Sequence, residues 1–395
     1  MPDQRPQDHD TGRFVRATVG DHAGWAYVPK ALPPALEMDL PLVNALSKAD
    51  RALGELAGLA RNLPNPYLLI NPFVYNEAVL SSRIEGTRAE VEDLYFFQGR
   101  QGVLPGMSPA HPPGDIQEVM NYVTAMEYGL ERLDSLPMSL RLMRELHQIL
   151  LEGVRGDHSD PGNFRRVQNW VGGEQFKDAI YVPPPVPEML TALDELEKYL
   201  HQENHLPSLV RLALIHFQFE AIHPFIDGNG RIGRLLTILL MVNWKLLPLP
   251  LLYLSAFFER HRQRYYDLLS GVSQKGQWRP WVEFFLSGVA RQAQEALDLS
   301  TRLMDLQAHW RAQLVGQRVP AGVLGLADQL FREPIMSVSQ ARDTLQVSYQ
   351  TASRYINRLV TLGILTPRGE SGYDRLYVAR DILRASRADQ SPTRG

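Results

Sequence analysis

Residues 223–234 read H-P-F-I-D-G-N-G-R-I-G-R, and the rest of the chain is organised around them. A histidine that can act as a base, His223, is followed four residues later by a carboxylate, Asp227. Two glycines around an asparagine come next, and then two arginines three residues apart. A simple glycine turn between helices needs neither the base, the carboxylate nor the arginines. The stretch therefore predicts a nucleotide-polyphosphate site with a catalytic histidine.

The chemistry of this site follows from its place before an apolar run, 231–246, which predicts a buried helix. The N-terminus of a helix binds phosphate through free backbone N–H groups, and glycines allow close approach. Arg231 and Arg234 lie on one face of its first turn, where each guanidinium can hold a different phosphate. Asp227 is placed to ligate Mg²⁺, and His223 to take a proton from an attacking hydroxyl. The pattern predicts in-line attack on a nucleoside triphosphate.

The composition is that of an ordinary soluble globular protein. The chain has 395 residues, 44% of them hydrophobic and 22% charged, so two or three domains are expected. A net charge of -3 provides no general attraction to nucleic acid or membrane. The absence of cysteine excludes disulfides, thiolate metal sites and cysteine nucleophiles. The polar N-terminus is no signal peptide, and the apolar run 235–252 is interrupted by Lys245 and two prolines, so we expect a cytoplasmic protein without membrane contact.

The distribution of helical periodicity, turn residues and prolines divides the chain into six segments. Apolar residues recur at helical spacing from Leu40 onwards, so the fold is predicted to be mainly α. The predicted segments are a weakly ordered N-terminal arm (1–35), an N-terminal helical region (36–112), a catalytic helical domain (113–300), a connecting helix (301–319), a winged helix-turn-helix domain (320–385) and a polar tail (386–395).

The C-terminal assignment depends on the order of its elements. Three helices, at about 324–331, 338–345 and 348–362, precede a two-stranded hairpin, which is the order of a winged helix-turn-helix. Arg354 and Arg358 on the third helix are suited to contacting DNA phosphates. Winged helices also serve as dimerisation or protein-docking units, so DNA and protein both remain candidate partners.

The motif H-P-F-x-D-G-N-G-R-x-x-R also resembles the signature loop of Fic proteins, most of which transfer AMP from ATP to protein hydroxyls. The helix predicted to open at Pro72 ends in Ser81-x-x-x-Glu85-Gly86, which resembles the inhibitory helix of the family. The run A-I-Y-V-P-P-P at 179–185 resembles the β-hairpin flap that holds a target segment as an added strand. The resemblance covers roughly residues 40 to 290 and implies a Fic-type helical bundle with a short flap. The docking residues it implies are Ile180, Tyr181 and Val182.

The resemblance also assigns a role to each matching residue. His223 would be the base and Asp227 the Mg²⁺ ligand. Glu85 would pair with Arg234 and block productive placement of the γ-phosphate, while Ser81 fixes the inhibitory helix to the active-site loop. The nucleotide-binding residues would be Gly228, Asn229, Gly230 and Arg231 for the α- and β-phosphates, Arg234 for the γ-phosphate, and Tyr266 and Leu269 at the adenine.

These observations together predict a protein adenylyltransferase that uses ATP and Mg²⁺, is autoinhibited by Glu85, and releases pyrophosphate. Its targets would be Ser, Thr or Tyr hydroxyls of other proteins and of the chain itself, and the family implies a homodimer. One alternative reverses the chemistry, with Glu85 orienting a water that hydrolyses AMP from a modified protein. Another is a DNA-binding regulator whose nucleotide site is a sensor. A metal hydrolase using His216, His223 and Asp227 is disfavoured because the chain has no H-E-x-x-H motif.

Overall fold

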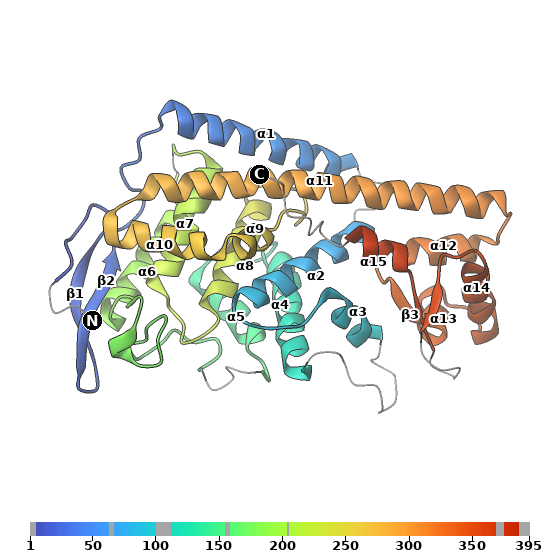
Figure 1. Cartoon of the computed structure of the whole chain (residues 1–395), viewed down its shortest axis with the longest axis horizontal. Helices are drawn as coiled ribbons and strands as arrows, with labels where there is room; N and C mark the ends of the chain where they lie inside the picture. Colours follow the sequence, from blue (N-terminus) through green and yellow to red (C-terminus); the bar gives the residue numbers. More distant parts are fainter. Residues whose placement is uncertain are drawn as a thin grey trace.

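The computed structural model describes residues 5–62, 67–99, 112–154, 159–203, 205–368 and 375–386. Helices dominate, as predicted, and the small sheets lie at the two ends of an elongated molecule (Figure 1). Nearly all of the predicted polar tail at 386–395 lies outside the described residues. None of the helices in the described ranges has the length and hydropathy that a membrane crossing requires.

The centre of the bundle is formed by α7 (Ser208–Ile222) and α8 (Asn229–Asn243). Both helices are buried almost all round, which agrees with their apolar sequences. The remaining helices of this region are α2 (Tyr67–Ile84), α3 (Val91–Gly99), α4 (Pro113–Arg132), α5 (Leu140–Leu150), α6 (Val186–His201), α9 (Ser255–Arg260) and α10 (Arg262–Lys275). The start of α2 corrects one prediction, because Pro72 lies inside the helix and not in its first turn.

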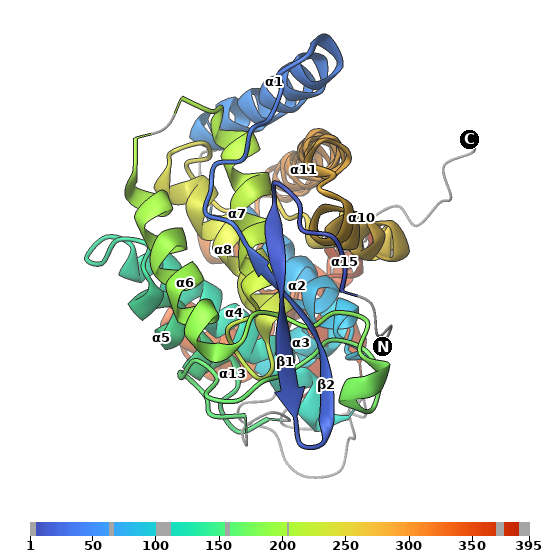
Figure 2. The ribbon, with the colours of Figure 1, turned by 90° about the vertical axis from the view of Figure 1, so that its left-hand side faces the viewer.

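Two long helices run along the molecule. The first is α1 (Leu40–Asn62), which packs along α11 (Trp278–Gly316), as both views show (Figures 1 and 2). The predicted boundary between the catalytic domain and the connecting helix at 301–319 falls inside α11, which continues unbroken across residue 300. Its sequence has neither glycine nor proline from Val289 to Val315, so nothing interrupts the hydrogen-bond ladder.

The N-terminus forms a β-hairpin, which overturns the prediction of a weakly ordered arm at 1–35. Strands β1 (Gly12–Val19) and β2 (His22–Pro29) pair antiparallel in full register. The hairpin covers one end of the bundle (Figure 2). Two small side chains of the hairpin, Ala17 and Ala26, are buried in one cluster with Phe176 and Val182 of the flap. The sequence carried a local signal for this hairpin, because β-branched and aromatic residues stand on both sides of the two-residue turn Gly20-Asp21. The burial partners on the flap come from a distant part of the chain.

The C-terminal elements follow the order expected for a winged helix. They are α12 (Ala321–Gln329), β3 (Ile335–Ser337), α13 (Val338–Leu345), α14 (Tyr349–Thr361), β4 (Thr366–Arg368), β5 (Leu376–Val378) and α15 (Arg380–Ser386). The sheet order is β3-β5-β4, so β3 adds a strand that was not predicted. Side-chain caps at Ser337 and Ser348 begin α13 and α14. The winged-helix assignment and its DNA partner stay predictions.

Candidate functional site

The loop at 223–228 is a tight connection between two buried helices. His223 ends α7 in the left-handed region (φ 51°), and Gly228 precedes α8 with φ 78°, where glycine carries no steric cost. The Asn229 side chain closes the loop, since it accepts from the Phe225 N–H and donates to the Phe225 carbonyl, both at 2.9 Å. Since its side chain is engaged within the loop, Asn229 has only its backbone N–H for the predicted contact with phosphate. This N–H lies in the first turn of α8, where no intrahelical acceptor exists.

The environment of His223 suits a base. Its Nδ1 lies 3.3 Å from the Glu220 carbonyl, which can only accept, so Nδ1 carries the hydrogen and Nε2 keeps a lone pair. Burial lowers the pKa of His223 to about 4, so the ring is neutral near pH 7. The side chain lines a cavity of about 380 Å³. A neutral imidazole facing a cavity can take a proton from a hydroxyl bound there.

Arg165 holds the histidine loop in place, and no role was predicted for it. Its guanidinium donates to three carbonyls, those of His223 (3.0 Å), Val167 (3.1 Å) and Pro184 (2.5 Å). Its backbone N–H donates to the Pro224 carbonyl at 2.9 Å. Burial lowers the pKa of Arg165 to about 10, which leaves it charged at neutral pH. Arg165 thus joins the catalytic loop to the base of the flap.

His147 on α5 supports the other end of the loop, and it too was missed. Its Nδ1 accepts from the Gly162 N–H at 2.9 Å, so Nε2 carries the hydrogen and donates to the Asp227 carbonyl at 3.0 Å. The ring stacks on Phe225 with centroids 3.8 Å apart. Burial lowers the pKa of His147 to about 4, so the ring is neutral at neutral pH and has the one N–H and one lone pair that these two hydrogen bonds require.

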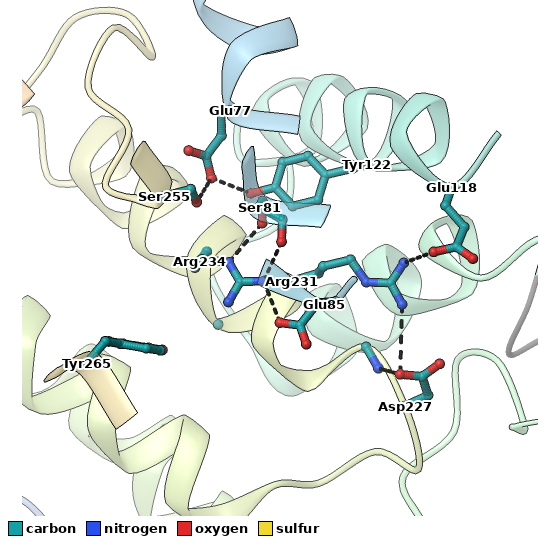
Figure 3. A network of polar contacts seen from close by, with 12 residues as sticks. Glu77, Ser81, Glu85, Glu118, Tyr122, Asp227, Arg231, Arg234, Ser255 and Tyr265 are labelled. Atoms are coloured by element: carbon teal, nitrogen blue, oxygen red, sulfur yellow. Dashed lines mark hydrogen bonds and ion pairs between the residues drawn. The ribbon is translucent and has the colours of Figure 1, made fainter. Parts of the chain in front are cut away.

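The first arginine of α8 is held by an acid that sequence reasoning did not find. Arg231 Nη1 lies 3.4 Å from Glu118 Oε2 on α4, and both side chains are only 3% exposed (Figure 3). Arg231 Nη2 lies 3.8 Å from Asp227 Oδ1, and this carboxylate also accepts from the Gly228 N–H at 2.6 Å. A positive charge is therefore fixed beside the helix N-terminus.

The second arginine makes the predicted contacts with α2. Arg234 donates from Nη2 to Glu85 Oε1 at 2.7 Å and to the Ser81 carbonyl at 2.9 Å, and from Nε to Ser81 Oγ at 2.8 Å (Figure 3). Burial acts to raise the pKa of Glu85, but the charge of Arg234 outweighs it and holds that pKa below the usual range. A Cβ at Gly230 would collide with the Glu85 carboxylate, so the carboxylate lies against the first turn of α8. Gly86, with φ 103°, ends the helical segment as expected.

The cavity brings together part of the predicted site, since Ser81, Val182, Asp227, Gly228, Asn229 and Arg231 are not among its lining residues. Its lining residues are Glu85, Val171, Ile180, Tyr181, Phe217, Glu220, Ala221, His223, Gly230, Arg234, Gln263, Tyr265, Tyr266, Asp267, Leu269, Ser270 and Ser273. Its charged and polar lining includes Glu85 after α2, Glu220 of α7 and Arg234 of α8, and α10 contributes Tyr266 and Leu269. Side chains from segments far apart in the sequence therefore line one cavity, and their roles stay predictions.

The flap differs from the predicted hairpin in two respects. It contains one bridge, between Val171 and Tyr181, and a short 3₁₀ turn instead of regular strands. Val182 is also not available to a target, because its side chain is buried against the N-terminal hairpin and its carbonyl accepts from the Tyr27 N–H at 2.9 Å. Ile180 is 75% exposed, and the Tyr181 hydroxyl donates to the Ala221 carbonyl at 2.6 Å.

The donor set near Asp227 fits a cation held largely by substrate. Among the residues that the structure describes, no group of three or more His, Asp or Glu side chains could hold a metal by itself. Mg²⁺ is commonly bound by one or two carboxylates together with substrate phosphates and waters. Asp227 is 47% exposed beside the α8 N-terminus, so its carboxylate can serve as that one protein ligand.

Two family models match segments of this chain. Residues 43–131 match the description "Fic/DOC family N-terminal", and residues 137–241 match "Fic/DOC family". The chain is similar to "Protein adenylyltransferase Fic" of Drosophila grimshawi, with 32% identity over 187 residues, and to its counterpart in Drosophila virilis, with 32% identity over 188 residues. Each match covers 46% of this chain and 34% of the relative, so it spans about a third of those proteins.

Solved structures show the same fold. A Fic family protein from Desulfovibrio desulfuricans superposes with a TM-score of 0.57 at 22% identity, covering 88% of this chain and 98% of that one. Fic-1 from C. elegans gives a TM-score of 0.51 at 22% identity, covering 65% and 73%. The N-terminal hairpin and the C-terminal elements lie outside the two matched family segments.

Proposed function

This chain is a Fic domain protein, and we propose that it transfers AMP from ATP to a protein hydroxyl. The observation that carries the proposal is the neutral His223, which faces the same cavity as the first turn of α8. The target oxygen would attack the α-phosphorus while its proton passes to His223 Nε2. The bond from the α-phosphorus to the oxygen bridging it to the β-phosphate would break, and pyrophosphate would leave.

The phosphate groups would be bound by the N-terminal turn of α8. Its backbone N–H groups and the helix dipole favour anions, and Gly230 leaves room for close approach, since the Glu85 carboxylate already lies where a Cβ would be. Arg231 adds a fixed positive charge beside this turn. Asp227 would hold Mg²⁺, which when bound neutralises phosphate charge. Tyr266 and Leu269 would border the adenine, because both line the cavity on α10.

Glu85 would keep the enzyme inactive. Its carboxylate occupies Arg234 and lies against Gly230, so it stands where a polyphosphate would need to be. Two anions cannot share this place without strong repulsion. Displacement of Glu85 would free Arg234 for the γ-phosphate and permit transfer.

The target would dock beside the flap. Ile180 offers an exposed apolar side chain at the cavity edge, and the bridge between Val171 and Tyr181 fixes the flap in an extended form that a target segment could follow. Hydroxyls of the chain itself would be modified in the same way, which provides a convenient assay.

The proposal is tested with Glu85→Gly and radiolabelled ATP. We expect self-labelling to rise by about tenfold or more, since removing one competing ion pair of about 1.4 kcal/mol corresponds to a factor of ten. Adding His223→Ala to this variant should abolish labelling while ATP still binds in calorimetry. Exposed Glu131 on α4 provides a control, because Glu131→Gly should leave labelling unchanged. Equal labelling by wild type and Glu85→Gly would contradict inhibition by Glu85, and labelling without His223 would contradict its role as base.

A second activity is favoured by the position of Glu85 in the same cavity as His223. In this case Glu85 would orient a water that releases AMP from a modified protein. Incubation of wild type and Glu85→Gly with AMP-modified protein, followed by measurement of free AMP, separates the two activities. Release by wild type that is lost in Glu85→Gly would favour hydrolysis.

A further inference from the structure

Glu220 is a carboxyl on the cavity wall to which the proposed reaction gives no task. It lies in the last turn of α7, three residues before His223, and it lines the same cavity as Glu85 and Arg234. Its Oε1 is buried and has no hydrogen-bond partner among the described residues. Leaving a buried polar atom unpaired costs about 1–3 kcal/mol, so such an atom calls for an explanation.

The surface of α8 is shaped to admit this carboxyl. A Cβ at Gly233 would lie 2.5 Å from Glu220 Oε1, just as a Cβ at Gly230 would collide with the Glu85 carboxylate. Gly230 and Gly233 are three residues apart and share one face of the helix, about 5–6 Å from each other. The two carboxyls therefore approach the same face of α8 one turn apart.

Their partners differ. Glu85 has the Arg234 guanidinium at 2.7 Å, whereas no ion pair or hydrogen bond of the Glu220 carboxyl is found in the described part of the chain. Glu77 is also buried near Arg234, but it does not line the cavity. Its Oε1 accepts from the Tyr122 and Ser255 hydroxyls, and its Oε2 has no partner among the described residues. Of these three acids, Glu220 is the one that combines a place on the cavity wall with an unpaired oxygen.

The charges around Glu220 favour its neutral form. Burial is the main cause that raises the pKa of Glu220 to about 7, the Glu85 charge adds to it, and Arg234 opposes it. The other titratable groups that line this cavity are His223 after α7, Tyr265, Tyr266 and Asp267 on α10, and Tyr181 on the flap. His223 is neutral, and burial raises the pKa of all three tyrosines above their usual value, so they are neutral as well.

We infer that protonated Glu220 donates a hydrogen bond to an oxygen of the nucleotide bound in this cavity, and that nucleotide affinity depends on that proton. The inference rests on the proposed function only in taking a nucleoside triphosphate as the ligand. The buried Oε1 packs against Gly233, so the other carboxyl oxygen would carry the proton and donate the hydrogen bond to a phosphate or ribose oxygen in the cavity. An ionised Glu220 would instead place a second negative charge beside the triphosphate and repel it.

The test measures the dissociation constant of ATP by calorimetry between pH 6 and 8 in the Glu85→Gly protein, with and without Glu220→Gln. If only the protonated carboxyl binds, a pKa of about 7 predicts that affinity falls about tenfold over this range, and loss of the Glu85 charge, which lowers that pKa, makes the fall larger. Glutamine donates a hydrogen bond at every pH, so the double variant should show only the titration of ATP itself. Glu220→Ala should bind about tenfold more weakly at pH 6 than the parent, since it has no donor. Glu131→Gln serves as the matched control and should keep the parental pH profile.

Two results would overturn the inference. One is an identical pH profile of ATP binding in the Glu220→Gln variant and in its parent. The other is an ATP affinity of the parent that rises with pH relative to that of the Glu220→Gln variant. Such a rise would indicate that an ionised Glu220 accepts a hydrogen bond from the ligand. Failure of the proposed function looks different, because AMP transfer would then be absent while the pH-dependent binding of ATP persists.

Discussion

Two arginines near the start of α8 form arginine–carboxylate pairs that differ in their surroundings. Arg231 meets Glu118 of α4 with both side chains 3% exposed, whereas Arg234 meets Glu85 at the end of α2, where the acid is 33% exposed (Figure 3). The first pair is closed off from the cavity, and the second forms part of its wall. A fully buried acid thus fixes a charge in place, while an acid that reaches the cavity can be exchanged for a ligand.

The position of each acid in its helix explains the difference. Glu118 lies in the middle of α4, where the backbone is held on both sides. Glu85 follows the last residue of α2, and Gly86 next to it has φ 103°. The negative end of the helix dipole disfavours a carboxylate there, so the Arg234 charge is what compensates Glu85. A segment at a helix end can move away at a lower cost than one inside a helix.

The largest expected effect is on stability and separates the two pairs. Glu118→Ala leaves the Arg231 charge buried, so the free energy of unfolding should fall by about 3–5 kcal/mol. Glu85→Ala also leaves a buried guanidinium, that of Arg234, but Ser81 still accepts two of its hydrogen bonds and the cavity opens beside it, so the loss should be smaller, about 1–3 kcal/mol. Urea unfolding of both variants measures this. Equal losses would mean that the two pairs contribute alike to stability.

A smaller effect is expected from Ser81, which binds Arg234 beside Glu85. Ser81→Ala removes the acceptor of Arg234 Nε, and a hydrogen bond of about 0.5–1.5 kcal/mol corresponds to a two- to tenfold rise in self-labelling. Ser82 is the matched control, because it is equally buried and its hydroxyl has no hydrogen-bond partner among the described residues. A rise of the same size in Ser82→Ala would point to general loosening of α2 instead.

The smallest effect is the pH dependence of the Glu85 pair. The pKa of Glu85 is lowered in the folded protein, so its contribution is fully present above the usual value of 4.5 and is lost as the pH falls through the folded value. The difference in unfolding free energy between wild type and Glu85→Gln should be about 1 kcal/mol at pH 7 and should vanish in acid. Urea titrations at pH 7, 5 and 3.5 measure this difference. If it stays the same at all three pH values, the ion pair of Glu85 is not what causes it.

The sequence predicted best where the functional groups lie close together along the chain. His223, Asp227 and the two arginines fall within twelve residues, so their spacing on a loop and a helix turn could be worked out directly. Glu85 is 149 residues from Arg234 and was found through the family resemblance. Arg165, His147 and Glu118 were missed because each acts through contacts with residues distant in sequence, and no periodic pattern marks such contacts.

The sequence by itself determined a mainly helical protein in which His223, Asp227 and two glycines stand together at a helix N-terminus, because these features depend on local spacing and on burial of apolar faces. The tertiary structure decided which acid each arginine meets, how the N-terminal hairpin is ordered against the flap, and that Glu220 faces the cavity without a partner among the described residues. These features come from packing between distant elements, and the pKa of a carboxyl is set by whatever that packing places around it.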